Sequence, residues 1–242
     1  MSPISWPVAR ATARERGLTP ITLGLVALLA VLAGFGRPGV GNEAFDGFSA
    51  FWFGLLTILM GAGLLSEEVE SGHAQMVLLR PLTRAQWVAG RLAGAATVVT
   101  FAAVLAWGTS FAAALVRGSG DYGLRVLVLP LALLPLLAWL ATLTAVSAVL
   151  RGWTNAAWVI AAYAGWKLLK LAVPFRFPGL KPLFESIDSC FGPQEAVMLA
   201  RQLTQHEPLQ LTPLLWDLFW LFACWLAAVR LFNLRELARR RA

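Results

Sequence analysis

The chain has 242 residues, of which 58% are hydrophobic and only 14% are charged, and its mean hydropathy is +0.68. A soluble globular domain carries about 25% charged residues, so this chain lacks the polar surface that a water-soluble protein needs. Its net charge of +7 does not indicate a nucleic-acid partner, because Arg and Lys gather at the ends of apolar runs, where they anchor and orient membrane helices. The composition therefore indicates an all-α integral membrane protein.

Six apolar runs are each long enough to cross most of a hydrocarbon core of about 30 Å as a helix. The fifth run contains Lys167 and Lys170, whose long side chains can reach an interface if that span ends early. Further runs follow the first one, so we interpret it as a span and not as a cleaved signal peptide. We predict a single domain over residues 1–242 with six transmembrane helices, at residues 18–35, 48–65, 88–116, 125–150, 153–173 and 214–232.

The distribution of cations predicts the orientation. Six spans leave both termini on one side of the membrane, and 12 of the 20 Lys and Arg residues fall on that side. Because cytoplasmic segments are enriched in Lys and Arg, we place both termini in the cytoplasm and the protein in a bacterial inner membrane. Residues 1–17 are then a basic cytoplasmic segment, and residues 174–213 are the longest outer loop.

Residues 66–82, between the second and third spans, form the most charged interruption of the apolar pattern. Pro81 ends the predicted helix there, because proline cannot donate a backbone N–H and disfavours helical geometry at the residue before it. We interpret the segment as a short amphipathic helix at the cytoplasmic interface. The acidic residues that it presents are Glu67, Glu68 and Glu70.

The next helix has a well-defined predicted start. Thr83 stands three residues before Gln86, which is the spacing of a capping box. A helix that is capped there continues directly into the third span, so the segment 66–82 is joined closely to the spans on both sides. The alternative interpretation is an ordinary capped loop that only separates two spans.

Small and hydroxyl residues characterise the middle of the chain. Gly90 and Gly94 form a GxxxG pattern, which predicts the close approach of another helix, within this chain first and in a dimer second. Hydroxyl side chains can line a weakly polar path, but in membrane helices they more often bond to backbone carbonyl groups. The hydroxyl residues concerned are Thr97, Thr100, Thr142, Thr144 and Ser147.

Few residues carry the patterns of catalysis or ligand binding. No G-x-x-x-x-G-K-[ST] loop is present, so we expect no cofactor in this chain and no ATP binding of its own. The acid nearest to a span centre is Asp217, close to the start of the sixth span, which disfavours an ion-driven carrier. The pair Ser110 and His206 is a weak basis for an intramembrane enzyme. Two separated cysteines, Cys190 and Cys224, predict neither a disulfide nor a metal site.

The segment from Glu67 to Arg91 resembles the signature of ABC-2 type transporter permeases. In that family an acidic pair, a glycine, an apolar stripe, a proline, a Ser/Thr that begins the next helix and a closing Gly-Lys/Arg occur in this order. Here these positions are filled by Glu68 and Glu70, Gly72, Val77 and Leu78, Arg80 and Pro81, Thr83 and Arg84, and Gly90 and Arg91. His73 and Ala74 depart from the pattern, where a Thr and a larger aliphatic residue are usual. The N-terminal segment also looks like the interfacial helix that precedes the first span in this family.

The resemblance implies a permease subunit of an ATP-binding cassette exporter. Residues 66–82 are then a coupling helix that docks on a separate ATPase, and the coupling residues are Glu68, Glu70, Gly72, Pro81, Thr83 and Arg84. Implied partners are two ATPase subunits, which bind ATP and Mg, and a second permease copy or a paralogue in the bilayer. The alternative is a non-transporting scaffold that recruits or matures an extracytoplasmic protein through residues 174–213.

Overall fold

The computed structural model describes residues 4–35, 48–70, 82–118, 122–184, 202 and 211–241. Over these residues the secondary structure is helical, without strands, which confirms the predicted all-α class. The helices are α1 (Trp6–Gly17), α2 (Pro20–Phe35), α3 (Phe48–Gly61), α4 (Ser66–Glu70), α6 (Arg84–Val116), α7 (Tyr122–Ser147), α8 (Thr154–Arg176), the 3₁₀ turn η1 (Pro178–Leu180) and α11 (Thr212–Arg241).

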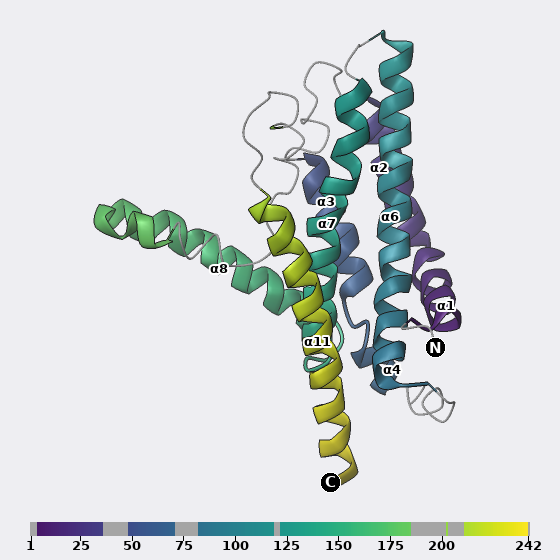
Figure 1. The fold of residues 1–242 in the computed structure, drawn as a ribbon, viewed down its shortest axis with the longest axis vertical. Coiled ribbons are helices and arrows are strands. Elements are labelled where there is room, and N and C mark those ends of the chain that lie inside the picture. The colour runs from purple at the N-terminus through teal and green to yellow at the C-terminus, as the bar shows by residue number, and fades with distance from the viewer. Residues whose placement is uncertain are drawn as a thin grey trace.

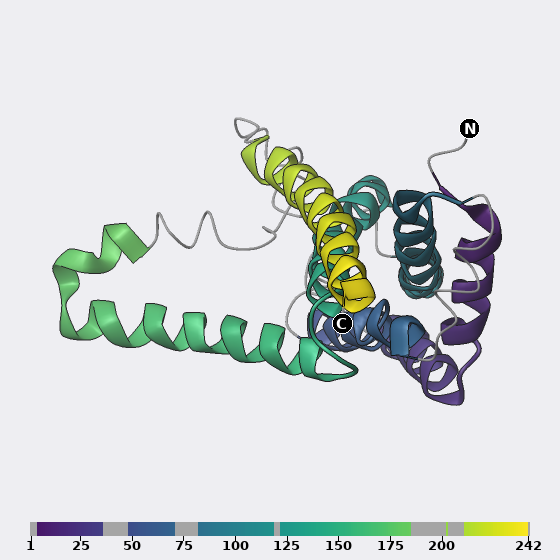
Figure 2. The same cartoon turned by 90° about the horizontal axis from the view of Figure 1, so that it is seen from below.

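Helices α2, α3, α6, α7 and α11 run along the length of a bundle, and α8 leaves it sideways (Figure 1). Helices α2 and α6 run in one direction along this axis, whereas α3, α7 and α11 run in the other. Seen from below, α8 also extends away from the other helices (Figure 2). Helices α1 and α4, the start of α6 and the C-terminal end of α11 all lie toward the same end of the molecule.

The chain turns sharply between α1 and α2. The two helices meet at an angle of 79° across Leu18 and Thr19. Pro20 stands at the first position of α2, where its missing N–H has no helical partner to lose. The predicted first span, residues 18–35, therefore corresponds to α2, and residues 6–17 form a separate helix that packs on α6.

The main core lies where α2, α3, α6 and α7 meet. It is made of aliphatic and aromatic side chains from α2, α3 and α7 that pack on an alanine-rich stripe of α6. Small side chains on α6 allow its neighbours to approach closely. The buried members are Leu25, Val26, Leu29, Phe53, Leu56, Met60, Leu64, Ala95, Val98, Val99, Ala102, Ala103, Ala106 and Leu140.

By length and composition, three helical segments in the described part of the chain can cross a membrane, and the bent pair α1–α2 is a fourth if it counts as one span. The three are Arg84–Val116, Leu129–Ser147 and Thr212–Arg235. Within α3, Trp52–Gly61 is apolar but shorter. Helix α8, the predicted fifth span, does not satisfy the same test, and it contains Lys167 and Lys170. The structure thus shows a multi-pass membrane protein without confirming six spans.

Candidate coupling region

The turn that joins α3 to α4 is held by one buried side chain. Gly63 has a φ of +64°, which only glycine adopts without strain. Its backbone N–H donates to Asn155 Oδ1 at 3.2 Å, while Asn155 Nδ2 donates to the carbonyls of Gly61 and Leu143, each at 3.2 Å. Asn155 is fully buried, so these bonds satisfy groups that water cannot reach. They fasten the end of α3 to α7 and α8.

Two serines strengthen this attachment. Leu65 donates its backbone N–H to Ser147 Oγ at 3.2 Å, and the N–H of Gly152 donates to Ser66 Oγ at 3.0 Å. Both serines are fully buried. The first residue of α4 is therefore bonded to the connection between α7 and α8, and the two segments are constrained to move together.

Two acidic residues of α4, Glu67 and Glu70, make ion pairs within this chain. Glu67 accepts a bond from Arg16 at 2.7 Å, and Glu70 Oε1 lies 3.6 Å from Arg151 Nε and 3.8 Å from Arg235 Nη2. About half of each carboxylate side chain stays exposed, at 49% for Glu67 and 45% for Glu70. The pairs link α4 to α1, to the α7–α8 connection and to α11, and leave both carboxylates accessible from outside.

Arg16 has a second set of partners. Its Nη1 donates to the carbonyls of Ala62 at 2.6 Å and Leu59 at 3.3 Å. These carbonyls lie at the C-terminal end of α3, where the last turn of a helix lacks internal donors and attracts a cation. One guanidinium therefore closes the end of α3 and holds the first turn of α4.

The start of α6 has the capping box predicted from the sequence. Thr83 Oγ1 accepts the N–H of Gln86 at 3.2 Å, and Gln86 Oε1 accepts the N–H of Thr83 at 3.0 Å. Arg84 donates to Asn233 Oδ1 of α11 at 3.1 Å. One turn further on, Trp87 is buried against Phe232 of α11, with the ring centroids 4.9 Å apart. The Arg84–Asn233 hydrogen bond and the Trp87–Phe232 ring contact thus join α6 to α11 at this end.

The GxxxG pattern packs against α1, which confirms contact within the chain. A Cβ on Gly90 would lie 2.9 Å from the carbonyl oxygen of Ser5, and one on Gly94 would lie 2.6 Å from Thr12 Cβ. Between the glycines, the buried Arg91 donates to Thr12 Oγ1 and to Glu15, both at 3.0 Å. Close backbone approach and a buried cation together fix α1 to the first turns of α6.

The hydroxyl groups of the spans bond to backbone carbonyl groups, which is the more common of the two roles considered from the sequence. Thr97, Thr142 and Thr144 donate to the carbonyls four residues earlier in their own helices, and Ser147 donates to Thr144 O. Thr142 also accepts the indole N–H of Trp220 at 2.8 Å. These hydroxyls therefore join and stabilise helices, and nothing in their contacts marks a polar path. No cluster of three His, Cys, Asp or Glu that could hold a metal occurs among the residues with described positions.

The proposed coupling residues are only partly visible. Glu68 and Glu70 lie in α4, and Thr83 and Arg84 begin α6, whereas Gly72 and Pro81 lie outside the described residues. His206, Cys190 and most of the segment 174–213 also lie outside them. The sequence singled out Arg91 in the family motif and Ser147 among the hydroxyl residues, but predicted neither of their partners. It did not indicate that the region is also connected by Arg16, Arg151, Asn155 and Arg235. The available signal was a polar residue next to an apolar run, and such a pattern does not indicate which residue is contacted.

Taken together, the helices define a multi-pass, all-helical membrane protein whose charged contacts gather at one end. A family model described as ABC-2 family transporter protein matches residues 21–174, which is more than half of the chain. The chain therefore belongs to the ABC-2 transporter family, as its sequence motif predicted, and is a membrane permease of that family. No curated protein sequence gives a significant match to it.

Proposed function

We propose that this chain is the permease subunit of an ATP-binding cassette transporter, which moves a substrate across or out of the inner membrane with ATP hydrolysed by a separate subunit. The observation that carries the proposal is the family match over residues 21–174, which includes α4 and the start of α6. Two ATPase subunits bind ATP and Mg, a second permease copy or a paralogue completes the transporter, and this chain holds no cofactor.

The coupling helix, residues 66–82, receives the movement of the ATPase. The acidic residues Glu68 and Glu70 contact a basic groove of that partner, and Gly72 allows the close approach. Pro81, Thr83 and Arg84 end this helix and start α6, so that displacement passes into the span without bending. The half-exposed Glu70 carboxylate supports this proposal, since it is able to exchange an internal arginine for one of the partner.

The contacts of α4 suggest which helices respond. A displacement of α4 acts on α1 through Arg16, on the start of α8 through Ser66 and Gly152, and on α11 through Glu70 and Arg235. Because α6 is bonded to α1 and α11 at the same end, it follows the same movement. The permease thereby converts a push at the cytoplasmic face into a concerted shift of several spans.

The scaffold alternative has no observation in its favour. Most of residues 174–213, on which it depends, lie outside the described residues.

Affinity purification of the full-length chain from native membranes tests the proposal. We expect an ABC-type ATPase to co-purify with the wild type and to be lost from the variant E68K/E70K. The matched control is E185K/D188K, which makes the same charge change in the predicted outer loop and should retain the ATPase. An ATPase that is absent from the wild type, or equally lost from both variants, would contradict the proposal. Size-exclusion profiles of the two variants verify that both remain folded.

A further inference from the structure

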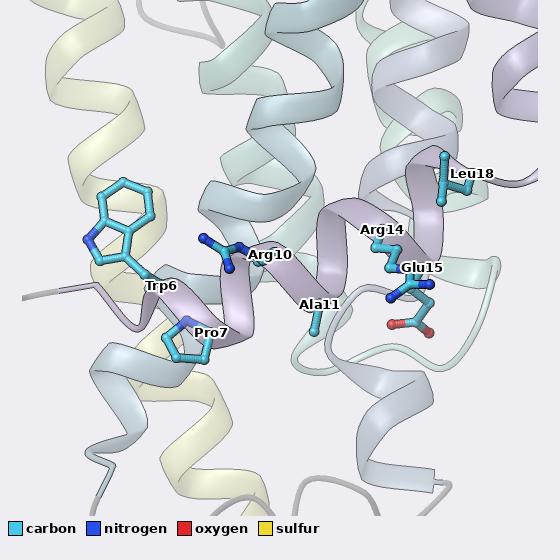
Figure 3. A pocket seen from close by; sticks show the side chains of 7 residues that line it. All are labelled: Trp6, Pro7, Arg10, Ala11, Arg14, Glu15 and Leu18. Carbon is cyan, nitrogen blue, oxygen red and sulfur yellow. The ribbon is translucent and has the colours of Figure 1, made fainter.

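The outward face of α1 carries an open surface hollow that the proposed coupling does not use. Six side chains of this helix and Leu18, which caps its C-terminal end, line it, and Figure 3 shows them: Trp6, Pro7, Arg10, Ala11, Arg14, Glu15 and Leu18. Trp6, Arg10, Arg14 and Leu18 follow each other at intervals of four residues, which places them in one row along a helix. The small Ala11 beside this row leaves space between its neighbours.

Arg10 and Arg14 are exposed and form no ion pair with any residue in the described part of the chain. Other cations of this end do have internal partners, since Arg16 pairs with Glu67 and Arg91 with Glu15. Glu15 lines the hollow, but its Oε2 lies 3.0 Å from the buried Arg91, which offsets its charge. The hollow is therefore left with two cations that have no internal anion.

The orientation of this row is fixed by the opposite face of α1. Ala9 and Thr12 are buried, and they pack on α6 at Gly94. Because a helix cannot rotate without losing that contact, Arg10 and Arg14 are held outward. Two guanidinium groups four residues apart, about 6 Å along the axis, present several N–H donors to one ligand.

The surroundings of the row fit a position at a membrane surface. Helix α1 lies at 79° to α2, so it runs nearly parallel to the bilayer if α2 crosses it steeply. Exposed apolar side chains flank the arginines: Trp6 is 64% exposed, Leu18 61% and Ile21, on the first turn of α2, 70%. Tryptophan with arginine is the combination that seats a helix at the boundary between head groups and acyl chains.

We propose that this row binds the head group of an anionic phospholipid. The phosphate accepts hydrogen bonds from Arg10 and Arg14, the indole of Trp6 lies among the head groups, and Leu18 and Ile21 contact the acyl chains. A soluble acidic ligand matches the charge but leaves these apolar flanks uncovered. The lipid fixes α1, and through Glu15 and Arg91 the start of α6, at a defined depth. This inference is independent of the proposed ATPase partner.

Spin-labelled lipids test the proposal on the full-length protein in vesicles. The probe is spin-labelled phosphatidylglycerol, compared with spin-labelled phosphatidylcholine, and the measured quantity is the motionally restricted fraction of each. We expect the wild type to prefer phosphatidylglycerol and the variant R10Q/R14Q to lose about fivefold of that preference for each arginine. The control K167Q/K170Q removes the same charge from α8 and should keep the preference.

A charge-conserving variant distinguishes the loss of positive charge from a loss of stability of α1. R10K/R14K should retain most of the preference, because lysine still attracts the phosphate. Loss of preference in R10K/R14K equal to that in R10Q/R14Q would overturn the proposal, as would equal binding of both lipids by the wild type. Inorganic phosphate at millimolar concentration should not release the restricted phosphatidylglycerol, and such a release would show a site for a free anion and also overturn it.

Discussion

Asn155 shows how one residue joins three helices. Its side-chain amide bonds to backbone groups of Gly61, Gly63 and Leu143, which belong to the end of α3, the turn after it and α7. Each of these groups is buried, and a buried donor or acceptor without a partner costs about 1 to 3 kcal/mol. The Asn155 amide therefore contributes more to the stability of the fold than its sequence position, at the edge of an apolar run, indicates.

The variant N155A tests this contribution. It removes three buried hydrogen bonds and leaves the N–H of Gly63 without its acceptor, while the carbonyl of Gly61 keeps the N–H of Leu64. We expect the free energy of unfolding to fall by about 3 kcal/mol, or the unfolding midpoint by roughly 6 to 12 °C. The measurement is thermal unfolding of the purified protein in detergent. T97A is the control, because the exposed Thr97 bonds only to the carbonyl of Ala93 in its own helix, and its midpoint should stay within about 2 °C. A midpoint for N155A as high as that of T97A would contradict the assignment.

Local patterns predicted local geometry well at this scale. The Thr83–Gln86 spacing specifies both bonds of a capping box, because both partners belong to the same helical turn. Asn155 and Arg16 have partners that lie many residues away, and no local spacing identifies such partners. Their positions follow only from how α3, α7 and α8 are brought together.

At the scale of helices, the packing of α1 against α6 depends on glycines in α6, which have no side chain. Gly94 faces Ala9 and Thr12 of α1, whereas a Cβ on Gly108, in the same helix, would meet nothing within 4 Å. We expect G94A to lower the free energy of unfolding by about 1 to 3 kcal/mol, since α1 must shift to admit a methyl group. G108A should be neutral or stabilising by up to about 1 kcal/mol, because alanine favours the helix. Equal unfolding midpoints for the two variants would show that α1 does not pack as described.

The link between α1 and α4 is asymmetric. Within the described part of the chain, the Glu67 carboxylate pairs with Arg16 alone, but Arg16 also bonds to the carbonyls of Leu59 and Ala62. R16Q should therefore destabilise more than E67Q, and the coupling energy from the double variant R16Q/E67Q should be about 0.2 to 1 kcal/mol. Chemical unfolding of the four proteins measures both quantities. If E67Q costs as much as R16Q, the carbonyl bonds contribute nothing.

Over the whole molecule, the direction of the helices bears on the number of membrane crossings. Helices α7 and α11 pack against each other and run in the same direction (Figure 1). The chain that leaves the end of α7 must therefore return along the length of the bundle before Thr212, and α8 is the long helix between them. Composition alone left the fifth span uncertain because of Lys167 and Lys170. The parallel arrangement requires the chain to pass from one end of the bundle to the other between Ser147 and Thr212, and the six-span prediction assigns that passage to α8, which leaves the bundle sideways in Figure 1.

Cysteine labelling determines whether α8 makes that crossing. In a background of C190S and C224S, we expect W153C to react with an impermeant maleimide only in inverted vesicles, because its end of α8 follows the end of α7 that the sequence predicts to be cytoplasmic. L183C and L211C should react from the outer side. All three side chains are exposed, so their reactivity reports the side of the membrane and not burial. Reaction of L183C from the cytoplasmic side would show that α8 lies on the membrane and that the return to α11 is made between residues 184 and 211.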